Sequence, residues 1–172
     1  MSEVLEKMQT RRSIRRYTAD MLPKDVIEKI VEAGTFAASG MNLQTPVIIA
    51  VTNKEIRDKM SKANAKVMGS DNDPFYGAPV VLVVLAEKKG TYVYDGSLVM
   101  GNLMLAAHEL GIGSCWIHRA KEVFEQEEWK QWLKGLGLKG EYEGIGNCVL
   151  GYVDGDYPNE LPRKDDRVYF VE

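Results

Sequence analysis

The sequence predicts an α+β fold in which helices cover both faces of one central mixed β-sheet. Residues 46–52 and 79–86 are short β-branched runs that are apolar on both faces, which is typical of central strands in a covered sheet. Helical patterns separate the expected strands, an order that a parallel Rossmann sheet would also give. The mixed, partly hairpin-length connections favour the α+β arrangement, as does a last β-branched run at 168–171 that follows a long polar tail.

The first half of the chain carries helical patterns on both sides of the first strand. Residues 3–9 have a helical pattern. Residues 23–38 open with Pro-Lys-Asp and repeat apolar residues at three- and four-residue steps, and the small residues around Ser39 and Gly40 end the pattern. A further helix joins the two strands and carries three apolar residues on one side: Ile56, Met60 and Ala63.

The second half begins with a helix over residues 95–110 that is apolar almost all round, with Asp95 as its N-cap. A helix of this kind is buried, and in a chain of this length its partner can be a second subunit. The later elements follow in order: a strand at 112–117, a helix from 120 to 134, a strand at 147–153, a polar, Pro-rich tail at 154–166 and a final strand at 168–171. No internal repeat or linker is visible, so we expect a single domain over residues 1–172.

Composition excludes several classes of partner. The chain has 172 residues, 45% of them apolar and 27% charged, which is typical of a soluble globular protein with one substantial core. Its net charge of −3 provides no overall basic field, so we expect neither nucleic acid nor a membrane surface as a partner. The start of the chain has no apolar signal region, and the longest apolar run, 78–86, is too short to span a bilayer.

Two cysteines bear on the compartment. Cys115 and Cys148 lie in apolar, strand-like contexts and have no Cys-x-x-Cys spacing. This context predicts buried free thiols, which implies a reducing, cytoplasmic location.

Positive charge is concentrated in residues 9–17. Four arginines flank one hydroxyl there, and no acidic residue lies between Glu6 and Asp20. Guanidinium groups grip phosphate in a bidentate manner, and a neighbouring serine adds a short donor, so the segment is a candidate anion site. Cations just past a helix C-terminus are also favoured by the helix dipole whatever the function, so a solvated helix end remains an alternative. The residues concerned are Arg11, Arg12, Ser13, Arg15 and Arg16.

Several other motifs fail on context. The Gly-x-Gly-x-x-Gly pattern at 135–140 follows a helix end, whereas the dinucleotide fingerprint must follow a strand and open a helix. Residues 71–73 begin like a calcium loop but lack its later glycine and glutamate, so they indicate a turn. His108 and His118 have no Cys or His partner at ligand spacing, and no Gly-x-Ser-x-Gly elbow is present. We therefore expect neither a metal site nor a serine nucleophile, and we name no catalytic side chain.

Four stretches, taken in order, resemble the nitroreductase family of FMN-dependent oxidoreductases. They are Arg-Arg-Ser-x-Arg-x-Tyr at 11–17, Ala-Ala-Ser-Gly-Met-Asn-Leu-Gln at 37–44, residues 95–117, and Leu-Gly-Tyr at 150–152 with Pro-Arg-Lys at 162–164. The likeness covers nearly the whole chain. It implies a central mixed sheet flanked by helices and a homodimer in which the C-terminal strand is exchanged between the subunits.

The resemblance also implies FMN at the dimer interface and suggests its contacts. Arg11 and Ser13 go to the phosphate and Arg15 reaches the pyrimidine side of the ring, while Arg12 adds to the positive charge of this segment. In the tail, Arg163 and Lys164 resemble a basic phosphate clamp, although solvated tail charges would look the same.

The ring contacts are expected from two other places. If residues 42–44 are extended, the carboxamides of Asn42 and Gln44 point the same way and can pair with the flavin's pyrimidine edge. Either residue alone also suits a turn or a solvent-facing position, and Thr45 and Pro46 stand where many relatives have Pro-Trp. The resemblance assigns ring and ribityl contacts from the opposite subunit to Ser39, Gly40, Asn42 and Gln44. It also places the backbone of Ile117, His118 and Arg119 along the flavin, with one amide facing N5; a core strand followed by surface His and Arg is the alternative.

The function implied is a two-step shuttle. NAD(P)H passes a hydride to flavin N5, and a small-molecule acceptor such as a nitroaromatic, a quinone or free flavin then takes the electrons in the same slot. A substrate wall can come from Phe75 and Tyr76 or from Phe124 and Trp129, each of which also suits core packing. The alternatives are a non-catalytic flavin- or nucleotide-binding protein and a specialised flavin reductase, such as a dehalogenase, on the same scaffold. Neither the acceptor nor the choice of NADH or NADPH follows from the residues.

Overall fold

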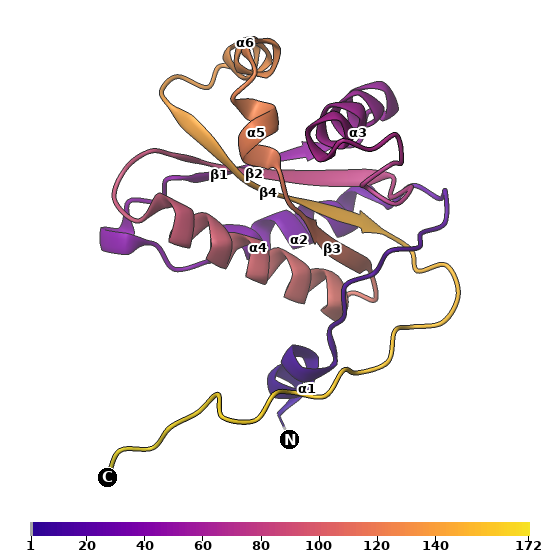
Figure 1. Ribbon diagram of the computed structural model, residues 1–172, viewed down its shortest axis with the longest axis vertical. Helices are drawn as coiled ribbons and strands as arrows, with labels where there is room; N and C mark the ends of the chain where they lie inside the picture. Colours follow the sequence, from indigo (N-terminus) through magenta and orange to yellow (C-terminus); the bar gives the residue numbers. More distant parts are fainter. Residues whose placement is uncertain (1) are drawn as a thin grey trace.

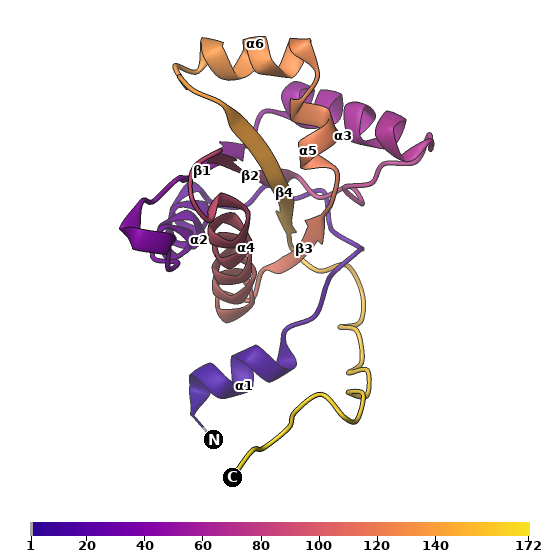
Figure 2. The same cartoon turned by 60° about the vertical axis from the view of Figure 1, so that its left-hand side comes forward.

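The computed structural model describes residues 2–172 and shows one four-stranded sheet with helices on both faces (Figure 1). The strands are β1 (Pro46–Val51), β2 (Val80–Glu87), β3 (Gly113–Ile117) and β4 (Tyr142–Gly151), in the order β1-β2-β4-β3. Helices α2 (Lys24–Thr35) and α4 (Tyr92–Glu109) pack on one face, and α3 (Lys54–Met68), α5 (Ala120–Phe124) and α6 (Glu127–Gly135) pack on the other (Figure 2). Helix α1 (Glu3–Thr10) lies apart from both layers, near the C-terminal end of α4. The α+β prediction is confirmed.

The strand pairing differs in detail from the mixed sheet that we expected. All three pairings between the named strands are antiparallel, and among the described residues the only parallel pairing is an isolated bridge between Ser13 and Ser114. A connecting helix does not by itself force a parallel crossover, and here α3 joins β1 to an antiparallel neighbour, β2.

Strand β2 is the centre of the core, because every side chain from Val80 to Ala86 is fully buried. The sequence predicted β1 as a second central strand, but β1 is an edge strand whose residues are mostly half-buried. The run Val168–Val171, predicted as a final strand, lies away from the sheet with exposed fractions of 71–97%. No strand of residues 2–172 therefore pairs with the free edge of β1.

Several helix boundaries also differ from expectation. Helix α4 starts three residues before Asp95, with Thr91 as its N-cap, so Asp95 is not the cap. Helix α4 is also not buried all round, since Leu98 is 50% exposed and Tyr94 is 74% exposed. The expected helix at 120–134 is two short helices separated by a bend, which lets the rings of Phe124 and Trp129 pack together at a centroid distance of 5.6 Å.

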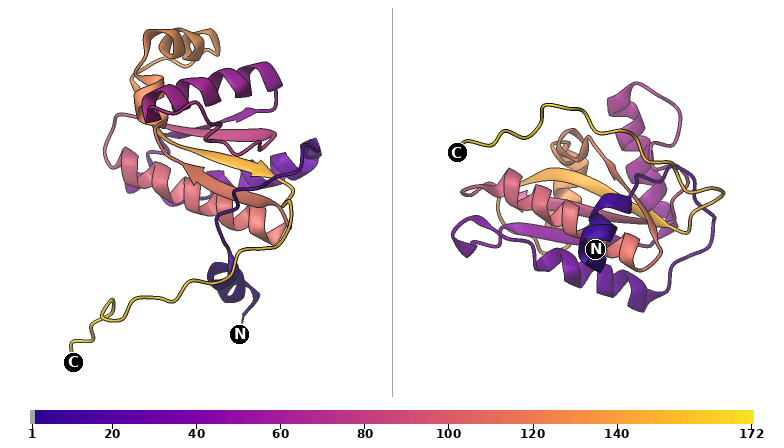
Figure 3. Two further views of the ribbon diagram at one scale, coloured as in Figure 1. Left: turned by 45° about the vertical axis from the view of Figure 1, so that its right-hand side comes forward. Right: turned by 90° about the horizontal axis from the view of Figure 1, so that it is seen from below.

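Both chain ends leave the sheet on the same side and run next to each other (Figure 3). The Thr18 amide donates to the Tyr152 carbonyl at 3.0 Å, and the Asp154 amide donates to the Arg16 carbonyl at 3.1 Å. The segment after β4 is thus hydrogen-bonded along the arginine segment. In the described residues, no helix combines the length and the apolar character needed to cross a bilayer.

Candidate functional site

The arginine segment is anchored to the end of the sheet where β3 begins. The Ile14 amide donates to the Ser114 carbonyl at 2.9 Å, and the Ile14 side chain is only 2% exposed. Tyr17 closes the segment by donating its hydroxyl to the Ile14 carbonyl at 2.7 Å, and burial raises the pKa of this hydroxyl, which keeps it protonated. An apolar anchor and a backbone bridge therefore hold the flanking arginines in fixed positions.

Arg11 is the guanidinium best suited to a ligand. Its Nη1 atom is buried and has no hydrogen-bond partner among the described residues. A buried charged donor without a partner is costly, so an arrangement of this kind is expected where an anion completes it. The nearby Ser13 hydroxyl and the Arg15 guanidinium lie close enough to Cys115 to lower the pKa of its thiol, although burial dominates and raises that pKa overall. These residues fit the phosphate of FMN in chemistry and charge.

Arg12 is used differently. Its guanidinium donates to the carbonyls of Gln9 at 2.7 Å and Arg11 at 2.8 Å, and it pairs with Glu160 at 3.4 Å. Carbonyls of the last turn of a helix lack partners within the helix, so Arg12 caps α1, which is the alternative that the sequence left open. Arg16 is exposed, and its one ion pair within residues 2–172 is with Asp154, at 3.4 Å. Of the four arginines, Arg11 and Arg15 are the ones left available to a ligand.

The loop at 39–44 lies at the other end of the molecule. Residues Gly40–Asn42 form one 3₁₀ turn, and Asn42 and Gln44 have φ values of 54° and 49°. Residues 42–44 are therefore not extended, and the turn that the sequence left as an alternative is present, because carboxamide side chains stabilise the left-handed conformation locally. The turn nevertheless brings the two side chains together: Gln44 Nε2 donates to Asn42 Oδ1 at 2.9 Å, and the Gln44 amide donates to Ser39 Oγ at 3.1 Å.

Asp95 fixes this loop to α4. Its Oδ1 atom accepts from the Gly40 amide at 3.1 Å and from the Thr91 hydroxyl at 2.9 Å. A Cβ at Gly40 would collide with the Thr91 hydroxyl, which explains why glycine stands there. Beside the loop lies a cavity of about 330 Å³ whose lining includes Ser39 and Gln44. The sequence had identified Asp95 only as a helix cap.

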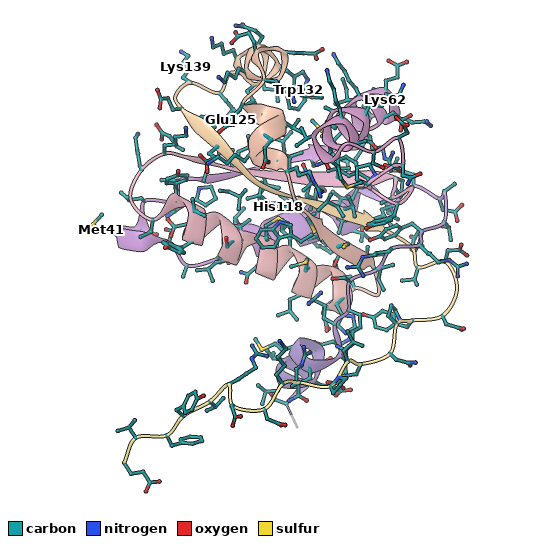
Figure 4. All side chains as sticks on the ribbon, in the orientation of Figure 1. Met41, Lys62, His118, Glu125, Trp132 and Lys139 are labelled. Carbon is teal, nitrogen blue, oxygen red and sulfur yellow. The ribbon has the colours of Figure 1, made fainter. Side chains whose placement is uncertain are left out.

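The two halves of the predicted site lie at opposite ends of α4. Gly40 is held at the start of the helix by Asp95, whereas Thr10, just before the arginines, contacts His108 in its last turn at 2.9 Å. At a rise of 1.5 Å per residue, the thirteen residues from Asp95 to His108 span about 20 Å. Figure 4 labels Met41, which marks the loop at the far end of α4 from the arginine segment. One chain does not bring the two halves together.

The end of β3 contributes a third part. Ile117 is buried in the sheet, His118 is exposed, and Arg119 has a φ of 73° where the chain turns into α5. Asn64, on α3, donates from Nδ2 to the His118 carbonyl at 2.8 Å and is only 1% exposed. Its Oδ1 atom is buried without a partner among the described residues. Nothing in the sequence marked Asn64, because its neighbours along α3 form an ordinary helix.

The remaining candidates are divided between the core and the exposed tail. Arg163 and Lys164 are exposed, and the tail just before them contacts the arginine segment through the pair between Glu160 and Arg12. Phe75, Phe124 and Trp129 are each at most 2% exposed, so they are core residues and form no substrate wall in this chain, whereas Tyr76 is 40% exposed.

The motifs that the sequence rejected are accounted for by local structure. Gly135 is the last residue of α6, so the Gly-x-Gly-x-x-Gly pattern is a helix end and a loop, as predicted. Asp73 holds its turn by accepting hydrogen bonds from Arg57, Ser61 and the amides of Phe75 and Gly77. Both cysteines are buried and free, as predicted, and burial raises the pKa of both thiols. Within residues 2–172, no group of three or more His, Cys, Asp or Glu side chains is arranged to hold a metal ion.

An antiparallel sheet flanked by helices, with a half-buried arginine at the sheet end whose Nη1 atom has no partner among the described residues, defines an α+β protein with a candidate anion site. The sequence profile of the nitroreductase family matches residues 8–72 and 66–152. A protein of Archaeoglobus fulgidus named as an NADH dehydrogenase/NAD(P)H nitroreductase is 35% identical over 159 residues, which cover 88% of this chain and 86% of that protein. A protein of the same name from Methanothermobacter thermautotrophicus is 33% identical over 120 residues, which cover 66% of this chain and 60% of that protein.

Solved structures agree with this assignment. A nitroreductase from Bacteroides fragilis with bound FMN superposes with a TM-score of 0.88 at 32% identity and covers both chains completely. A nitroreductase from Desulfitobacterium hafniense with bound FMN gives a TM-score of 0.87 at 27% identity, again over the full length of both chains. The chain belongs to the nitroreductase family.

Proposed function

We propose that this chain is an FMN-dependent NAD(P)H oxidoreductase in which residues 1–172 form a single cofactor-binding domain. The observation that carries the proposal is the buried, unpartnered Nη1 of Arg11 beside Ser13 and Arg15, on a chain with a net charge of −3. Membership of the nitroreductase family supports it, as do the FMN-bound structures of similar proteins. Relatives named as NAD(P)H nitroreductase and FMN reductase support the nicotinamide co-substrate.

The proposed cofactor contacts are those that the family resemblance suggests for these residues. Arg11 and Ser13 hold the phosphate, and Arg15 supplies positive charge to the pyrimidine side of the ring. Asn42 and Gln44, already hydrogen-bonded to each other, offer donors and acceptors to the pyrimidine edge. The remaining proposed contacts are Arg12 for charge, Ser39 and Gly40 for the ring and ribityl chain, the backbone of Ile117, His118 and Arg119, and Arg163 and Lys164 from the tail.

The separation of the two half-sites supports a homodimer with the cofactor at its interface. The arginine segment and the 39–44 loop lie about 20 Å apart along α4. In a two-fold dimer that packs α4 against its copy in the opposite direction, the loop of one subunit comes to the arginines of the other. The exposed flank of α4 at Tyr94 and Leu98 is suited to this contact.

The free edge of β1 supports exchange of the C-terminal strand. A groove of about 700 Å³ lies between α2 and this edge, with a mainly apolar lining that includes Met21, Ile27 and Ala50. The tail ends in Val168–Val171, a β-branched and aromatic run that is exposed in the single chain. We propose that this run from one subunit pairs with the β1 edge of the other.

When bound, FMN supplies a ring that accepts a hydride from NAD(P)H and returns two electrons to an acceptor such as a nitroaromatic, a quinone or free flavin. The chain's own part is to bind and orient. Arg11 and Ser13 fix one end of the cofactor, and the β3 end places a backbone amide along the ring. We assign no side chain as an acid or base, because solvent can supply the protons.

Anaerobic reduction tests the proposal. Purified protein reconstituted with FMN is mixed with NADH or NADPH without oxygen, and the flavin absorbance is followed. Bleaching by one nucleotide and recovery on addition of a quinone or nitroaromatic is the expected result, and it also gives the nucleotide preference. A flavin that binds but stays oxidised for many minutes would indicate a flavin-binding protein instead. Protein that takes up no FMN would refute both readings.

A further inference from the structure

A chain of hydrogen bonds joins the C-terminal tail to the arginine segment through the end of α4. The Arg12 amide donates to the Tyr157 hydroxyl oxygen at 3.0 Å, and that hydroxyl lies 3.1 Å from His108 Nδ1. On the other side of the ring, His108 Nε2 lies 2.9 Å from the Thr10 hydroxyl, which donates to the Glu6 carbonyl at 2.8 Å. The rings of His108 and Tyr157 also stack, with an interplanar angle of 29°.

The donor and the acceptor of every hydrogen bond in this series are fixed. Thr10 donates its only hydroxyl proton to the Glu6 carbonyl, so the Thr10 hydroxyl oxygen must accept a hydrogen bond from His108. The proton of the neutral imidazole is therefore on Nε2. His108 Nδ1 is then an acceptor and takes the Tyr157 hydroxyl proton. The Tyr157 oxygen is left to accept the Arg12 amide. This series of hydrogen bonds is complete only while His108 is neutral.

The surroundings of His108 keep it neutral. Burial lowers the pKa of His108, and the cations Lys7 on α1 and Arg11 and Arg12 in the next segment lower it further, while Glu109 on α4 acts in the opposite direction. The tail contributes only the uncharged Tyr157 to the ring itself. At neutral pH the imidazole is therefore an acceptor at Nδ1.

We propose that Tyr157 is a positioning residue that holds the backbone at Arg12 and thereby sets the places of Arg11 and Ser13 for a phosphate group. Arg11 and Ser13 directly flank the amide that Tyr157 holds, and a small rotation there would move both side chains. The link also couples the site to the route of the tail, because Glu160 pairs with Arg12 three residues further on. The inference rests on the proposed function only for the identity of the ligand.

The position of Tyr157 distinguishes a positioning role from a general role in stability. Tyr157 is 43% exposed and lies outside both core clusters, so replacing its hydroxyl leaves the packing of the sheet untouched. The substitution Tyr157→Phe removes only the acceptor for the Arg12 amide and the donor to His108. Tyr152→Phe is a matched control in the same tail, because the Tyr152 hydroxyl makes no hydrogen bond in the described residues while its carbonyl accepts from Thr18.

Binding of FMN and of riboflavin, which lacks the phosphate, separates positioning from scaffold effects. For Tyr157→Phe we expect the FMN dissociation constant to rise by roughly 2- to 13-fold, the equivalent of one hydrogen bond. We expect riboflavin affinity, and both affinities of Tyr152→Phe, to change less than twofold. His108→Gln, whose amide cannot face Thr10 and Tyr157 at once, should show the same FMN-selective loss. Equal weakening toward FMN and riboflavin, or an unchanged FMN affinity, would overturn the positioning role.

Nuclear magnetic resonance on the protein without FMN tests the hydrogen-bond chain independently. The sequence has only two histidines, so His118→Gln assigns the His108 signals. We expect the neutral ring of His108 to carry its proton on Nε2. We also expect its titration midpoint to rise by several tenths of a pH unit in Tyr157→Phe, because a hydrogen bond to the neutral form is lost. A proton on Nδ1 of the neutral ring, or an unchanged titration midpoint in Tyr157→Phe, would refute this series of hydrogen bonds. Wild-type protein that fails to bind FMN would refute the proposed function instead.

Discussion

Replacing Arg11 with alanine removes the one guanidinium nitrogen that is buried and without a partner among the described residues. If this group binds the FMN phosphate, its loss removes a charge-assisted hydrogen bond worth about 1.5–3 kcal/mol. Since about 1.4 kcal/mol corresponds to a factor of ten, the FMN dissociation constant should rise by roughly ten- to a hundredfold. Arg16→Ala is the matched control, because Arg16 is exposed, pairs only with Asp154, and removes the same charge from the same segment.

Thermal unfolding with and without FMN measures this effect together with the cost to the protein itself. At an FMN concentration one hundred times the wild-type dissociation constant, binding stabilises the fold by about 2.7 kcal/mol. The same concentration stabilises Arg11→Ala by only about 1.4 kcal/mol if affinity falls tenfold, and by about 0.4 kcal/mol if it falls a hundredfold. The unfolding temperature without FMN should stay close to that of the wild type, because Nη1 has no hydrogen bond to lose among the described residues. If FMN stabilised Arg11→Ala as much as the wild type, Arg11 would not bind the phosphate. The same conclusion would follow if Arg16→Ala lost as much FMN stabilisation as Arg11→Ala.

Two further predictions follow, one on acid stability and one on the shared site. Burial would raise the pKa of Asp73, but hydrogen bonds from Arg57, Ser61 and two amides outweigh it and lower the pKa below 3.8. The stability that Asp73 provides is thus complete above its unfolded pKa and is lost as pH falls through its folded pKa. Asp73→Asn should therefore have a free energy of unfolding about 1–3 kcal/mol lower than that of the wild type at pH 7. In denaturant titrations, this difference in free energy should become smaller below pH 4, and a difference that stays constant with pH would contradict the prediction. For the shared site, Arg11→Ala and Gln44→Ala chains carrying different tags are co-expressed, and the mixed dimer is purified. If each site takes Arg11 from one subunit and Gln44 from the other, half of the sites regain wild-type FMN affinity, whereas a site within one chain regains none.

The sequence predicted those parts of the fold that depend on local pattern. The apolar, Val-rich run at 79–86 was predicted as a central strand, and β2 is the centre of the sheet. The small residues at 39–40 ended α2 where expected, within a few residues. The cation cluster could be found from the sequence because charge density is visible in a linear sequence. Its division into a cap, Arg12, and an available group, Arg11, required the structure.

The contacts that the sequence did not predict join residues that are far apart in the chain. Asn64 holds the His118 carbonyl across 54 residues, Asp95 holds the Gly40 amide across 55, and Tyr157 holds the Arg12 amide across 145. Each residue has an unremarkable local context, so no periodicity or motif could mark it. The same holds for β1, whose apolar pattern is that of a central strand although a single chain leaves it at an edge. The apolar pattern of β1 would match its surroundings if, as proposed, the tail of a second subunit covers this edge.

Helix α4 explains why the site is divided. Asp95 attaches the 39–44 loop to its first turn, and His108 attaches the arginine segment to its last turn, so the helix holds the two half-sites about 20 Å apart. A rigid helix cannot shorten, and the connecting segments are held by hydrogen bonds at both ends, so internal motion would have to break one attachment to unite the halves. In the proposed dimer, two copies related by a two-fold axis would unite them without breaking either attachment, and they would form two equivalent sites at once. The buried carboxylate of Asp95 and the neutral imidazole of His108 then have equivalent roles, because each fixes a segment that carries proposed cofactor contacts to one end of the same helix. On this argument, the length of α4 between these two residues determines whether a second subunit can complete the site.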